Sequence, residues 1–373
     1  MKVLFVNNNL SGLVNFRMDV LQHLQALGHD VVAVVPSSEK DCQNEEGIKF
    51  LHVPLHRTSV NPLYDLLFFF SLLRIFIQEK PDYAFLYTIK PNIYGTLVAH
   101  VCGVSSSMMM AGLGYAFSND SLASRIARRL YRISLNYTDY LLLLNEKDVE
   151  TISRLGMCKP EKMLFLQAGE GVNLQRFHFR DNRCDKVRFL FIGRLLREKG
   201  IFDFIEAARL VKRQYLNVEF QIAGEIDKDA PGCLTSEEFA ELASSSEVDY
   251  LGHVDVLRKL EEPGIVMVVP SYYSEGLNRS LMEGCATGKP IITTNLPGCR
   301  EAVVEDRNGY LVPARQPHVL AEAMLRYLSL PDEKKQCMSL ESRRLAESRF
   351  DVRLVYKVYE GILSKHQLHL GSY

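Results

Sequence analysis

Short apolar runs alternate with segments of helical length along both halves of the chain. In the first half the apolar runs lie at 3–6, 30–35, 83–87 and 140–144, and helices are predicted at 16–26, 63–78, 94–102 and 122–136. The alternation restarts with runs at 187–192, 218–223, 248–251, 265–269 and 291–294. Strands that alternate with helices at this spacing predict parallel, buried sheets. The fold class is therefore α/β, with two consecutive open, Rossmann-like domains that bind ligand between the carboxyl ends of their strands.

A polar, irregular stretch at 174–186 separates the two halves. We place a first domain at 1–176 and a second at 177–352, each large enough to hold its own core. Residues 352–364 alternate apolar and polar at helical spacing, and we expect a helix at 353–373 to pack back on the first domain. The opening strand is not followed by G-x-G-x-x-G, which disfavours a dinucleotide-dependent oxidoreductase.

Composition excludes several classes of protein. A net charge of −1 gives no overall field that would attract nucleic acid. The eight cysteines are scattered without a C-x-x-C pair, which favours reduced thiols in the cytosol over disulfides or a zinc site. The opening residues KVLFVNNN predict a buried strand and not a signal peptide. The longest apolar run, 66–73, falls short of the roughly 20 residues that span a bilayer, so we expect a cytoplasmic protein.

Two glutamates flank the start of a predicted helix in the segment 271–290. The helix is expected to run from Leu277 to Ala286, and its unpaired N–H groups favour a bound anion. Glu275 precedes the helix, and Glu283 lies about two turns into it. The two carboxylates suit hydroxyl groups at the two ends of an extended ligand whose phosphates lie between them. Taken alone, the pair is explained better by solvated side chains at a helix start.

Arg194 and Lys199 lie on one short loop between a predicted strand and a predicted helix, within G-R-x-x-x-x-K-G. A guanidinium and an ammonium together suit a diphosphate, and neutralising a departing diphosphate is a large electrostatic contribution to catalysis. The alternative is that both side chains are solvated.

Taken in order, the motifs of the second half resemble those of glycosyltransferase family 4, which has the GT-B fold. The resemblance implies two Rossmann-like domains that face each other across a cleft. They are G-R-L-x-x-x-K-G, Ala223-Gly224-Glu225, P-S-x-x-S-E-G-x6-E and G-K-P-I-I. The resemblance implies that Glu275 contacts the donor sugar and Glu283 the ribose, while Arg194 and Lys199 hold the diphosphate. It makes Arg194, Lys199 and Glu275 the candidate catalytic residues. The further donor-binding candidates are Gly12, Gly193, Gly224, Gly252, His253, Val254, Gly276, Leu277 and Asn278.

The first half is similar to a narrower group of bacterial surface-polysaccharide enzymes, including the transferases that add N-acetylgalactosamine to undecaprenyl-diphosphate-linked bacillosamine. The matching pieces are Ser11-Gly12, Asn15-Phe16-Arg17, T-I-K-P-N-I-Y-G at 88–95, Gly112-Leu113-Gly114 and G-E-G-V-N at 169–173. The acceptor-side candidates are Asn15, Arg17, Lys90, Asn92, Gly114 and Glu170. A loop position of Gly12 would let backbone approach a donor phosphate or the acceptor.

Two departures from the family pattern leave roles open. Many members carry a histidine where this chain reads Ile89-Lys90, so the role of that imidazole passes to Lys90 or Thr88, or is absent. A small residue is common where this chain has Glu170, whose side chain either touches the acceptor or is simply exposed.

The segment 122–137 predicts a basic amphipathic helix. Its four arginines fall on one side and its apolar residues on another, namely Arg125, Arg128, Arg129 and Arg132 against Leu122, Ile126, Leu130 and Ile133. Such a helix suits an anionic membrane surface or an acceptor phosphate; the alternative is a cover helix with a solvated arginine face. The nearby segment 66–77 is unusually apolar for a surface helix. A membrane or lipid surface is one interpretation, and burial in a cover helix is the favoured one.

The resemblance implies a retaining enzyme that moves a hexose or N-acetylhexosamine from a UDP-sugar to a polyprenyl-diphosphate-linked or other saccharide acceptor. No cofactor or metal is expected, since Asp227-Lys228-Asp229 reads as a solvated turn. The expected partners are the UDP-sugar, the acceptor and, peripherally, the inner face of the cytoplasmic membrane, but no nucleic acid. The alternatives are a UDP-sugar epimerase or soluble-acceptor synthase of the same fold, and a non-catalytic nucleotide-sugar binder.

Overall fold

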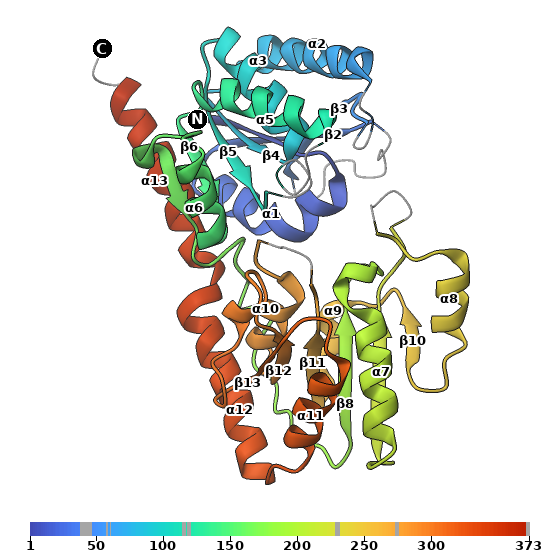
Figure 1. Cartoon of the computed structure of the whole chain (residues 1–373). Coiled ribbons are helices and arrows are strands. Elements are labelled where there is room, and N and C mark those ends of the chain that lie inside the picture. Colours follow the sequence, from blue (N-terminus) through green and yellow to red (C-terminus); the bar gives the residue numbers. More distant parts are fainter. Residues whose placement is uncertain are drawn as a thin grey trace. The chain divides into compact units, whose positions relative to one another are not determined.

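The computed structural model describes residues 1–37, 47–56, 59, 61–113, 117, 121–227, 232–272 and 276–370. The chain divides into two compact units, Met1–Gly171 with Val352–Tyr373, and Val172–Asp351. Each unit is built on a parallel sheet with helices packed against it (Figure 1). The predicted α/β fold class is confirmed.

The first unit has a seven-stranded parallel sheet of order β3-β2-β1-β4-β5-β6-β7. Its strands are β1 (Lys2–Val6), β2 (Asp30–Pro36), β3 (Lys49–Val53), β4 (Tyr83–Tyr87), β5 (Ser105–Met110), β6 (Tyr140–Leu143) and β7 (Met163–Phe165). The strand order reverses between β1 and β4. The carboxyl ends of these two strands therefore form the switch point at which open α/β sheets bind ligands.

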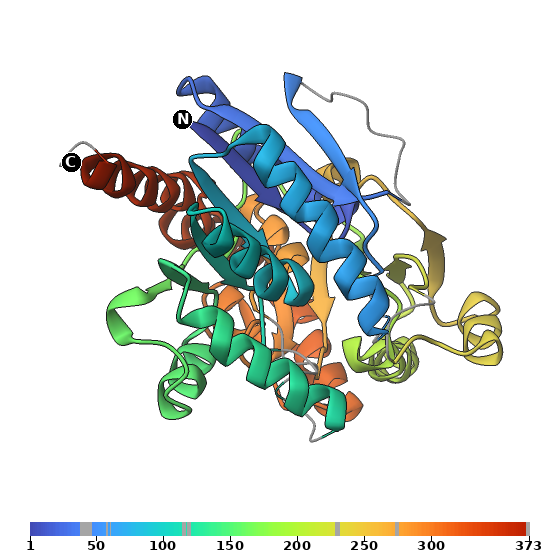
Figure 2. The same ribbon diagram turned by 90° about the horizontal axis from the view of Figure 1, so that it is seen from above.

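Helices cover both faces of this sheet (Figures 1 and 2). One face packs against α1 (Leu10–Ala26) and α13 (Val352–Leu370). The other face packs against α2 (Pro62–Glu79), η2 (Pro91–Gly95), α3 (Thr96–Val101), α5 (Leu122–Leu135) and α6 (Glu146–Arg154). With both faces covered, the central strands are almost completely buried, as their apolar sequences require.

The first helix corrects one sequence prediction. Residues 7–15 were expected to form a loop, but α1 begins at Leu10 with Asn9 as its N-cap. The Asn9 side chain accepts a hydrogen bond from the Gly12 backbone N–H at 2.7 Å, which satisfies one of the free donors of the first turn. Gly12 therefore lies in a helix, where a Cβ would stand 2.2 Å from Asn9 Oδ1.

The second unit has a six-stranded parallel sheet of order β10-β9-β8-β11-β12-β13. Its strands are β8 (Val187–Ile192), β9 (Val218–Ala223), β10 (Asp249–Gly252), β11 (Ile265–Val269), β12 (Ile291–Thr294) and β13 (Gly309–Val312). Its helices are α7 (Ile201–Lys212), α8 (Ser236–Ala243), α9 (Val256–Glu261), α10 (Arg279–Ala286), α11 (Pro317–Leu328) and α12 (Asp332–Leu345), with the short turns η4 (Arg197–Lys199), η5 (Arg300–Ala302) and η6 (Ala346–Phe350). The order reverses between β8 and β11, which marks the corresponding switch point of this unit.

Among the described residues, no helix combines the length and the apolar character needed to cross a membrane. The described cysteines form no disulfide.

Candidate functional site

Hydrogen bonds tie together the loops that follow three neighbouring strands of the second unit. The Gly193 N–H donates to the Ala223 carbonyl at 3.1 Å, and the Gly224 N–H donates to the Gly252 carbonyl at 2.8 Å. The Tyr250 hydroxyl adds a third bond, to the Gly224 carbonyl at 2.9 Å. Three of the donor-binding candidates therefore lie on adjoining loops at the carboxyl edge of β8, β9 and β10.

Gly224 is tightly confined at this edge. Its φ is +149°, and a Cβ there would lie 1.9 Å from the Gly193 carbonyl oxygen. Neither atom of that contact belongs to a flexible side chain, so a larger residue must push the two loops apart.

Gly224→Ala is therefore expected to lower the free energy of unfolding by about 2–4 kcal/mol, because it combines a backbone clash with an unfavourable φ. The control is Gly361→Ala on α13, where no heavy atom lies within 4 Å of the added Cβ. That change should be neutral or stabilise the helix by up to about 1 kcal/mol. Thermal unfolding measures both, and equal melting temperatures for the two variants would contradict the prediction.

Lys199 ends the short turn η4 and is only 9% exposed. The preceding residue, Glu198, accepts a hydrogen bond through its carbonyl from the Tyr272 N–H at 2.8 Å and another from the Ser271 hydroxyl at 3.2 Å. Lys199 is thus fixed beside the loop that follows β11, across the switch point from its own strand. An ammonium held in this buried position would act on a bound anion with little screening by water.

Arg194 is held more loosely than Lys199. Its side chain is 52% exposed, and its Nη1 lies 3.1 Å from the Asp227 carboxylate. Two residues before it, the Ile192 carbonyl accepts a hydrogen bond from the Ser280 hydroxyl at 3.0 Å, which joins the end of β8 to the first turn of α10. The structure therefore brings the loop that carries Arg194 next to the amino end of α10.

Helix α10 begins at Arg279, two residues later than predicted. Asn278 is its N-cap, with a side chain that accepts from the Leu281 N–H at 3.2 Å. Gly276 and Leu277 precede the helix and supply backbone N–H groups next to its positive end. Glu275 lies outside the described residues.

Glu283 lies in α10, buried within the second unit. Its side chain is 11% exposed, and its Oε1 accepts a hydrogen bond from Arg279 Nε at 2.7 Å. Burial raises the pKa of the Glu283 carboxyl above its ordinary value, although Arg279 and Arg176 act in the opposite direction. The solvated glutamate considered from the sequence is therefore wrong for Glu283, whose Oε2 accepts no hydrogen bond from a described residue.

His253 and Val254 occupy the loop after β10. His253 is exposed, and its Nδ1 lies 3.6 Å from the exposed Glu225 carboxylate. Val254 packs against the core of the unit. The His253 side chain is therefore accessible to a ligand, whereas Val254 is half-buried and contributes to the packing of the unit.

Lys289 of the G-K-P-I-I motif has a structural role. It is completely buried, and its Nζ donates to Asn182 Oδ1 at 2.9 Å and to the Glu262 carbonyl at 2.7 Å. Burial lowers the pKa of its ammonium to about 8 from an ordinary value of 10.5.

This shift predicts a pH dependence of stability. Between pH 8 and 10.5 the unfolded chain binds a proton at Lys289 that the folded chain does not bind. The free energy of unfolding should therefore rise with pH in this window, by about 3 kcal/mol, and this gain is lost as the pH falls through 8. Lys289→Met removes this titrating group. When the free energy of unfolding is measured with urea at a series of pH values, the wild type and the variant should therefore depend differently on pH. The same pH dependence in both proteins would contradict the prediction. Lys334→Met, at an exposed position, serves as the control.

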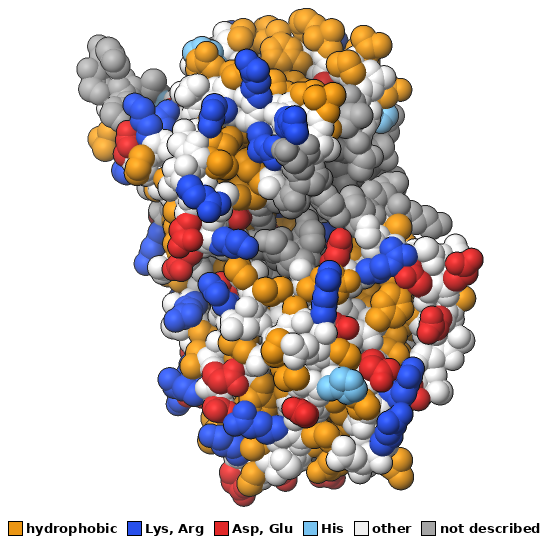
Figure 3. Space-filling model, viewed as in Figure 1, with side chains coloured by type: hydrophobic (Ala, Val, Ile, Leu, Met, Phe, Trp, Pro, Cys, Tyr) orange, Lys and Arg blue, Asp and Glu red, His pale blue; other side chains and the backbone are white. Residues whose placement is uncertain are grey.

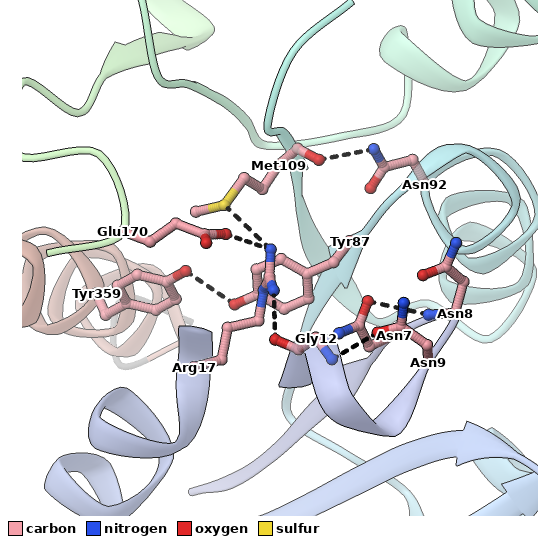
Figure 4. Close-up of polar contacts among 10 residues, drawn as sticks. All are labelled: Asn7, Asn8, Asn9, Gly12, Arg17, Tyr87, Asn92, Met109, Glu170 and Tyr359. Carbon is pink, nitrogen blue, oxygen red and sulfur yellow. Dashed lines mark hydrogen bonds and ion pairs between the residues drawn. The ribbon is translucent and has the colours of Figure 1, made fainter. Parts of the chain in front are cut away.

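A second group of polar side chains lies at the switch point of the first unit (Figure 4). Arg17 is its centre, 5% exposed, with its guanidinium 4.2 Å from the centre of the Tyr87 ring. The guanidinium donates to the Gly12 carbonyl at 3.0 Å and forms an ion pair with Glu170. Tyr87 in turn shares a hydrogen bond of 2.8 Å with Tyr359 of α13. Glu170 is therefore neither an exposed residue nor an unpaired one.

Several buried polar atoms near this group lack a hydrogen-bond partner among the described residues. They are Asn7 Nδ2, Arg17 Nε, Thr88 Oγ1 and Asn92 Oδ1. Thr88 also has a φ of +73°, which is rare for a β-branched residue and is typical of functional loops. Buried polar groups normally find partners, so these atoms are candidates for contacts with a polar ligand.

Two acceptor-side candidates, Lys90 and Asn15, are not part of this group, and a third is not described. The Lys90 ammonium is bound by the Asp65 carboxylate at 2.7 Å and by the carbonyls of His56 and Ser59 at 2.8 and 2.7 Å. These contacts hold the Lys90 ammonium against residues of the first unit. Asn15 is exposed on α1. Gly114 lies outside the described residues.

Sequence reasoning missed Asn7, Tyr87 and Tyr359. Asn7 follows a buried strand directly, which is a usable signal for a residue at a carboxyl edge. The two tyrosines are separated by 272 positions, and no sequence pattern pairs them.

Helix α5 exposes much of the apolar side that its sequence predicts. Leu122, Ile126 and Ile133 are 75%, 51% and 43% exposed. The buried positions are Ser124, Tyr131, Ser134 and Leu135. Of the four candidate arginines, Arg125, Arg129 and Arg132 are exposed and Arg128 is half-buried; Arg132 also donates to the Leu155 carbonyl at 3.0 Å. Arginines and apolar side chains therefore share one exposed surface.

No group of three or more His, Cys, Asp or Glu side chains that could hold a metal ion occurs among the described residues.

Comparison with known proteins places the chain in a family. Residues 186–329 match the model for glycosyl transferases group 1, and residues 11–169 match the model for a glycosyl transferase 4-like domain. A relative from Campylobacter jejuni, N,N'-diacetylbacillosaminyl-diphospho-undecaprenol alpha-1,3-N-acetylgalactosaminyltransferase, is 25% identical over 96% of this chain and 97% of its own length. An Escherichia coli relative, UDP-Gal:alpha-D-GlcNAc-diphosphoundecaprenol alpha-1,3-galactosyltransferase, is 22% identical over 83% of this chain and 81% of its own.

Solved structures share the fold at low sequence identity. Sucrose-phosphate synthase from Thermosynechococcus elongatus superposes with a TM-score of 0.80 at 16% identity, over 99% of this chain and 100% of the other. HepE from Anabaena, in complex with UDP-glucose, superposes with a TM-score of 0.76 at 15% identity, over 98% and 100%. The two family models together cover both halves of the chain, which therefore belongs to the group 1 glycosyltransferases of family 4, enzymes with the GT-B fold.

Proposed function

We propose that this enzyme transfers a hexose or N-acetylhexosamine from a UDP-sugar to a saccharide acceptor carried on a polyprenyl diphosphate, with retention of anomeric configuration. The acceptor class is supported by the names of the Campylobacter and Escherichia relatives, which specify undecaprenyl-linked substrates. The donor class is supported by the Escherichia relative, which uses a UDP-sugar, and by the Anabaena structure with UDP-glucose.

The observation that carries the proposal is the position of Lys199. Lys199 as a residue is nine-tenths buried on a loop hydrogen-bonded to the loop after β11, and Arg194 lies on the same loop beside the amino end of α10. Two cations and a helix amino end together favour a diphosphate. Glu283 then accepts from the ribose hydroxyls through Oε2, and Glu275 contacts the donor sugar.

In the proposed reaction, the bond between the anomeric carbon and the diphosphate oxygen breaks, and that oxygen keeps the electron pair. The acceptor hydroxyl forms the new glycosidic bond, and its proton leaves with UDP. Arg194, Lys199 and the backbone N–H groups near Leu277 and Asn278 stabilise the charge that develops on the diphosphate. We propose that these groups suffice without a metal ion.

On the acceptor side, we propose that saccharide hydroxyls bond to the polar atoms at the switch point of the first unit. Asn7 Nδ2 and Arg17 Nε supply donors, and Asn92 Oδ1 supplies an acceptor. Arg17 is fixed for this role by Gly12, Tyr87 and Glu170. The exposed arginines of α5 suit an anionic membrane. We propose that the enzyme binds peripherally to the inner face of the cytoplasmic membrane.

Two measurements test the proposal. A thermal-shift screen of UDP-, GDP- and ADP-sugars should show stabilisation by UDP-sugars, since a ligand that binds the folded state raises its stability. Transfer of labelled sugar to polyprenyl-diphosphate saccharides should persist in EDTA and give a product with the donor's anomeric configuration, read by NMR. Interconversion of UDP-sugars without acceptor would identify an epimerase instead, transfer to free saccharides a soluble-acceptor synthase, and UDP binding without any turnover a binding protein.

A further inference from the structure

Helix α2 exposes an apolar stripe on its outward side. Its members recur at helical spacing and are each more than half exposed: Leu63 (66%), Leu66 (52%), Leu67 (56%), Phe70 (56%) and Ile77 (59%). Positions three, four and seven apart lie on one side of a helix, so these five side chains form a continuous surface, which we call the α2 ridge. Arg74 is also exposed and lies within the same stripe.

The opposite side of α2 already packs against the sheet. Phe68, Leu72 and Phe76 are each at most 1% exposed in the core beneath the helix. Burial therefore explains only the inner half of the segment 66–77, and the favoured sequence interpretation does not account for its outer half. A helix that is apolar all round is normally covered on all sides. The α2 ridge is not covered by any described residue.

The neighbouring helices continue this surface. Helices α2, α3 and α5 lie side by side in one layer over the sheet (Figure 2). In Figure 3 hydrophobic side chains crowd the upper edge of the first unit, and Lys and Arg side chains lie directly below them. From α5, Leu122, Ile126 and Ile133 add exposed apolar groups, with Arg125 and Arg129 between them.

The layer is also free of unpaired negative charge. Helices α2, α3 and α5 contain only two carboxylates, Asp65 and Glu79. Asp65 is bound by Lys90 at 2.7 Å, and Glu79 by Lys49 at 2.6 Å. The surface is therefore apolar and cationic. That combination complements an anionic lipid surface, whereas two copies of it would repel each other.

We propose that the α2 ridge inserts into the boundary between head groups and acyl chains of an anionic phospholipid bilayer, with Arg125 and Arg129 on the lipid phosphates. Amphipathic helices bind membranes in this way, through buried apolar area and attraction to anionic head groups. The inference deepens the proposed function and rests on it for the location of the acceptor. Docking itself requires neither donor nor acceptor and is measured without turnover.

A single reporter tests insertion, because the chain contains no tryptophan. Phe70→Trp should show a blue-shifted emission and quenching by brominated lipids when vesicles of phosphatidylcholine with phosphatidylglycerol are added. Leu216→Trp in the second unit, at a residue that is 93% exposed, is the control and should show neither change. Unchanged emission from Trp at position 70 would overturn the proposal.

Paired substitutions separate the two contributions to binding. In vesicle co-sedimentation, Leu67→Gln with Phe70→Gln should lower the partition coefficient about ten-fold or more on all vesicles, because it removes apolar area from the interface. Arg125→Gln with Arg129→Gln should lower it about five-fold per arginine, only on anionic vesicles and less at high salt. The matched controls are Leu216→Gln and Arg258→Gln, both at exposed positions of the second unit, and thermal unfolding verifies that each variant folds.

The outcomes of these experiments separate membrane insertion from self-association, and the membrane contact from the proposed function. Partition of both pairs of variants equal to wild type would overturn the proposal. So would dimers that dissociate on Leu67→Gln with Phe70→Gln in size-exclusion chromatography, since the ridge would then bind a second copy. A wild-type protein that binds anionic vesicles but transfers no sugar would refute the proposed function and leave the membrane contact standing.

Discussion

Lys199→Ala is expected to lower kcat/KM for sugar transfer by about 10³, and Arg194→Ala by about 10². Both cations are proposed to stabilise the negative charge that develops on the departing diphosphate. Their effects differ because Lys199 is 9% exposed, whereas the Arg194 side chain is 52% exposed and shared with Asp227. Water screens a buried charge less than an exposed one, so removal of the buried charge should lower kcat/KM more.

Steady-state kinetics with a UDP-sugar and a polyprenyl-linked saccharide measure both variants. The control is Arg209→Ala, on an exposed surface of α7 where the arginine pairs with Glu206 at 2.9 Å. It should retain wild-type kcat/KM. All variants should keep the wild-type melting temperature within a few degrees, which separates catalytic loss from unfolding. Wild-type turnover by both Arg194→Ala and Lys199→Ala would refute the proposed donor site.

Arg17→Met is expected to lower the free energy of unfolding by about 3–5 kcal/mol. The variant leaves the Glu170 carboxylate, whose side chain is 11% exposed, without its cationic partner. It also removes the hydrogen bond to the Gly12 carbonyl and the contact with the Tyr87 ring. Breaking a buried ion pair from one side costs more than deleting both partners, since the remaining charge is uncompensated.

A double-mutant cycle tests the physical cause. Glu170→Gln alone keeps the guanidinium on Gly12 and Tyr87, so it should cost less than Arg17→Met. The double variant should be more stable than the sum of the two single effects predicts. Exposed Arg209→Met is the control and should stay within about 0.5 kcal/mol of wild type. Hydrogen exchange on α1 and β4 localises the loss, and additivity in the cycle would contradict the proposed coupling.

The strands of the interior were predictable from sequence. Five of them have the bounds expected: β4, β8, β9, β11 and β12. Each is a short run of apolar residues, four of them rich in β-branched side chains or ended by Gly or Pro, and such runs have few alternatives to a buried strand. The parallel arrangement follows from the helices between them.

Other elements gave no such signal. Strand β5 reads SSSMMM, which carries neither β-branched residues nor alternation, yet tertiary contacts hold it between β4 and β6. The early start of α1 depends on one side-chain hydrogen bond from Asn9, in a stretch of three asparagines that reads equally well as a loop. Local helix propensity predicts the start of a helix poorly where a single capping side chain determines it.

The candidate site likewise contains residues that the sequence could place and contacts that it could not. Arg194 and Lys199 were placed on a common loop at a strand end, and sequence spacing alone supports that placement. The partner of Arg17 is 153 positions away, and only the folded sheet brings Glu170 to it. The exposure of the outward face of α2 could not be predicted for a different reason. Hydrophobic periodicity indicates which side of a helix is apolar, but not whether another element covers that side.

The first unit is not continuous in sequence, because its helix α13 follows the whole second unit. Val355, Tyr359, Ile362 and Leu363 fill the same core as β1 and β4, although the whole second unit is encoded between them. During synthesis on the ribosome, that face of the first sheet can pack against α1 but lacks the cover that α13 supplies until residues beyond 351 emerge. Vectorial folding therefore favours completion of the second unit before the first, and leaves a nascent apolar sheet face that a chaperone could shield.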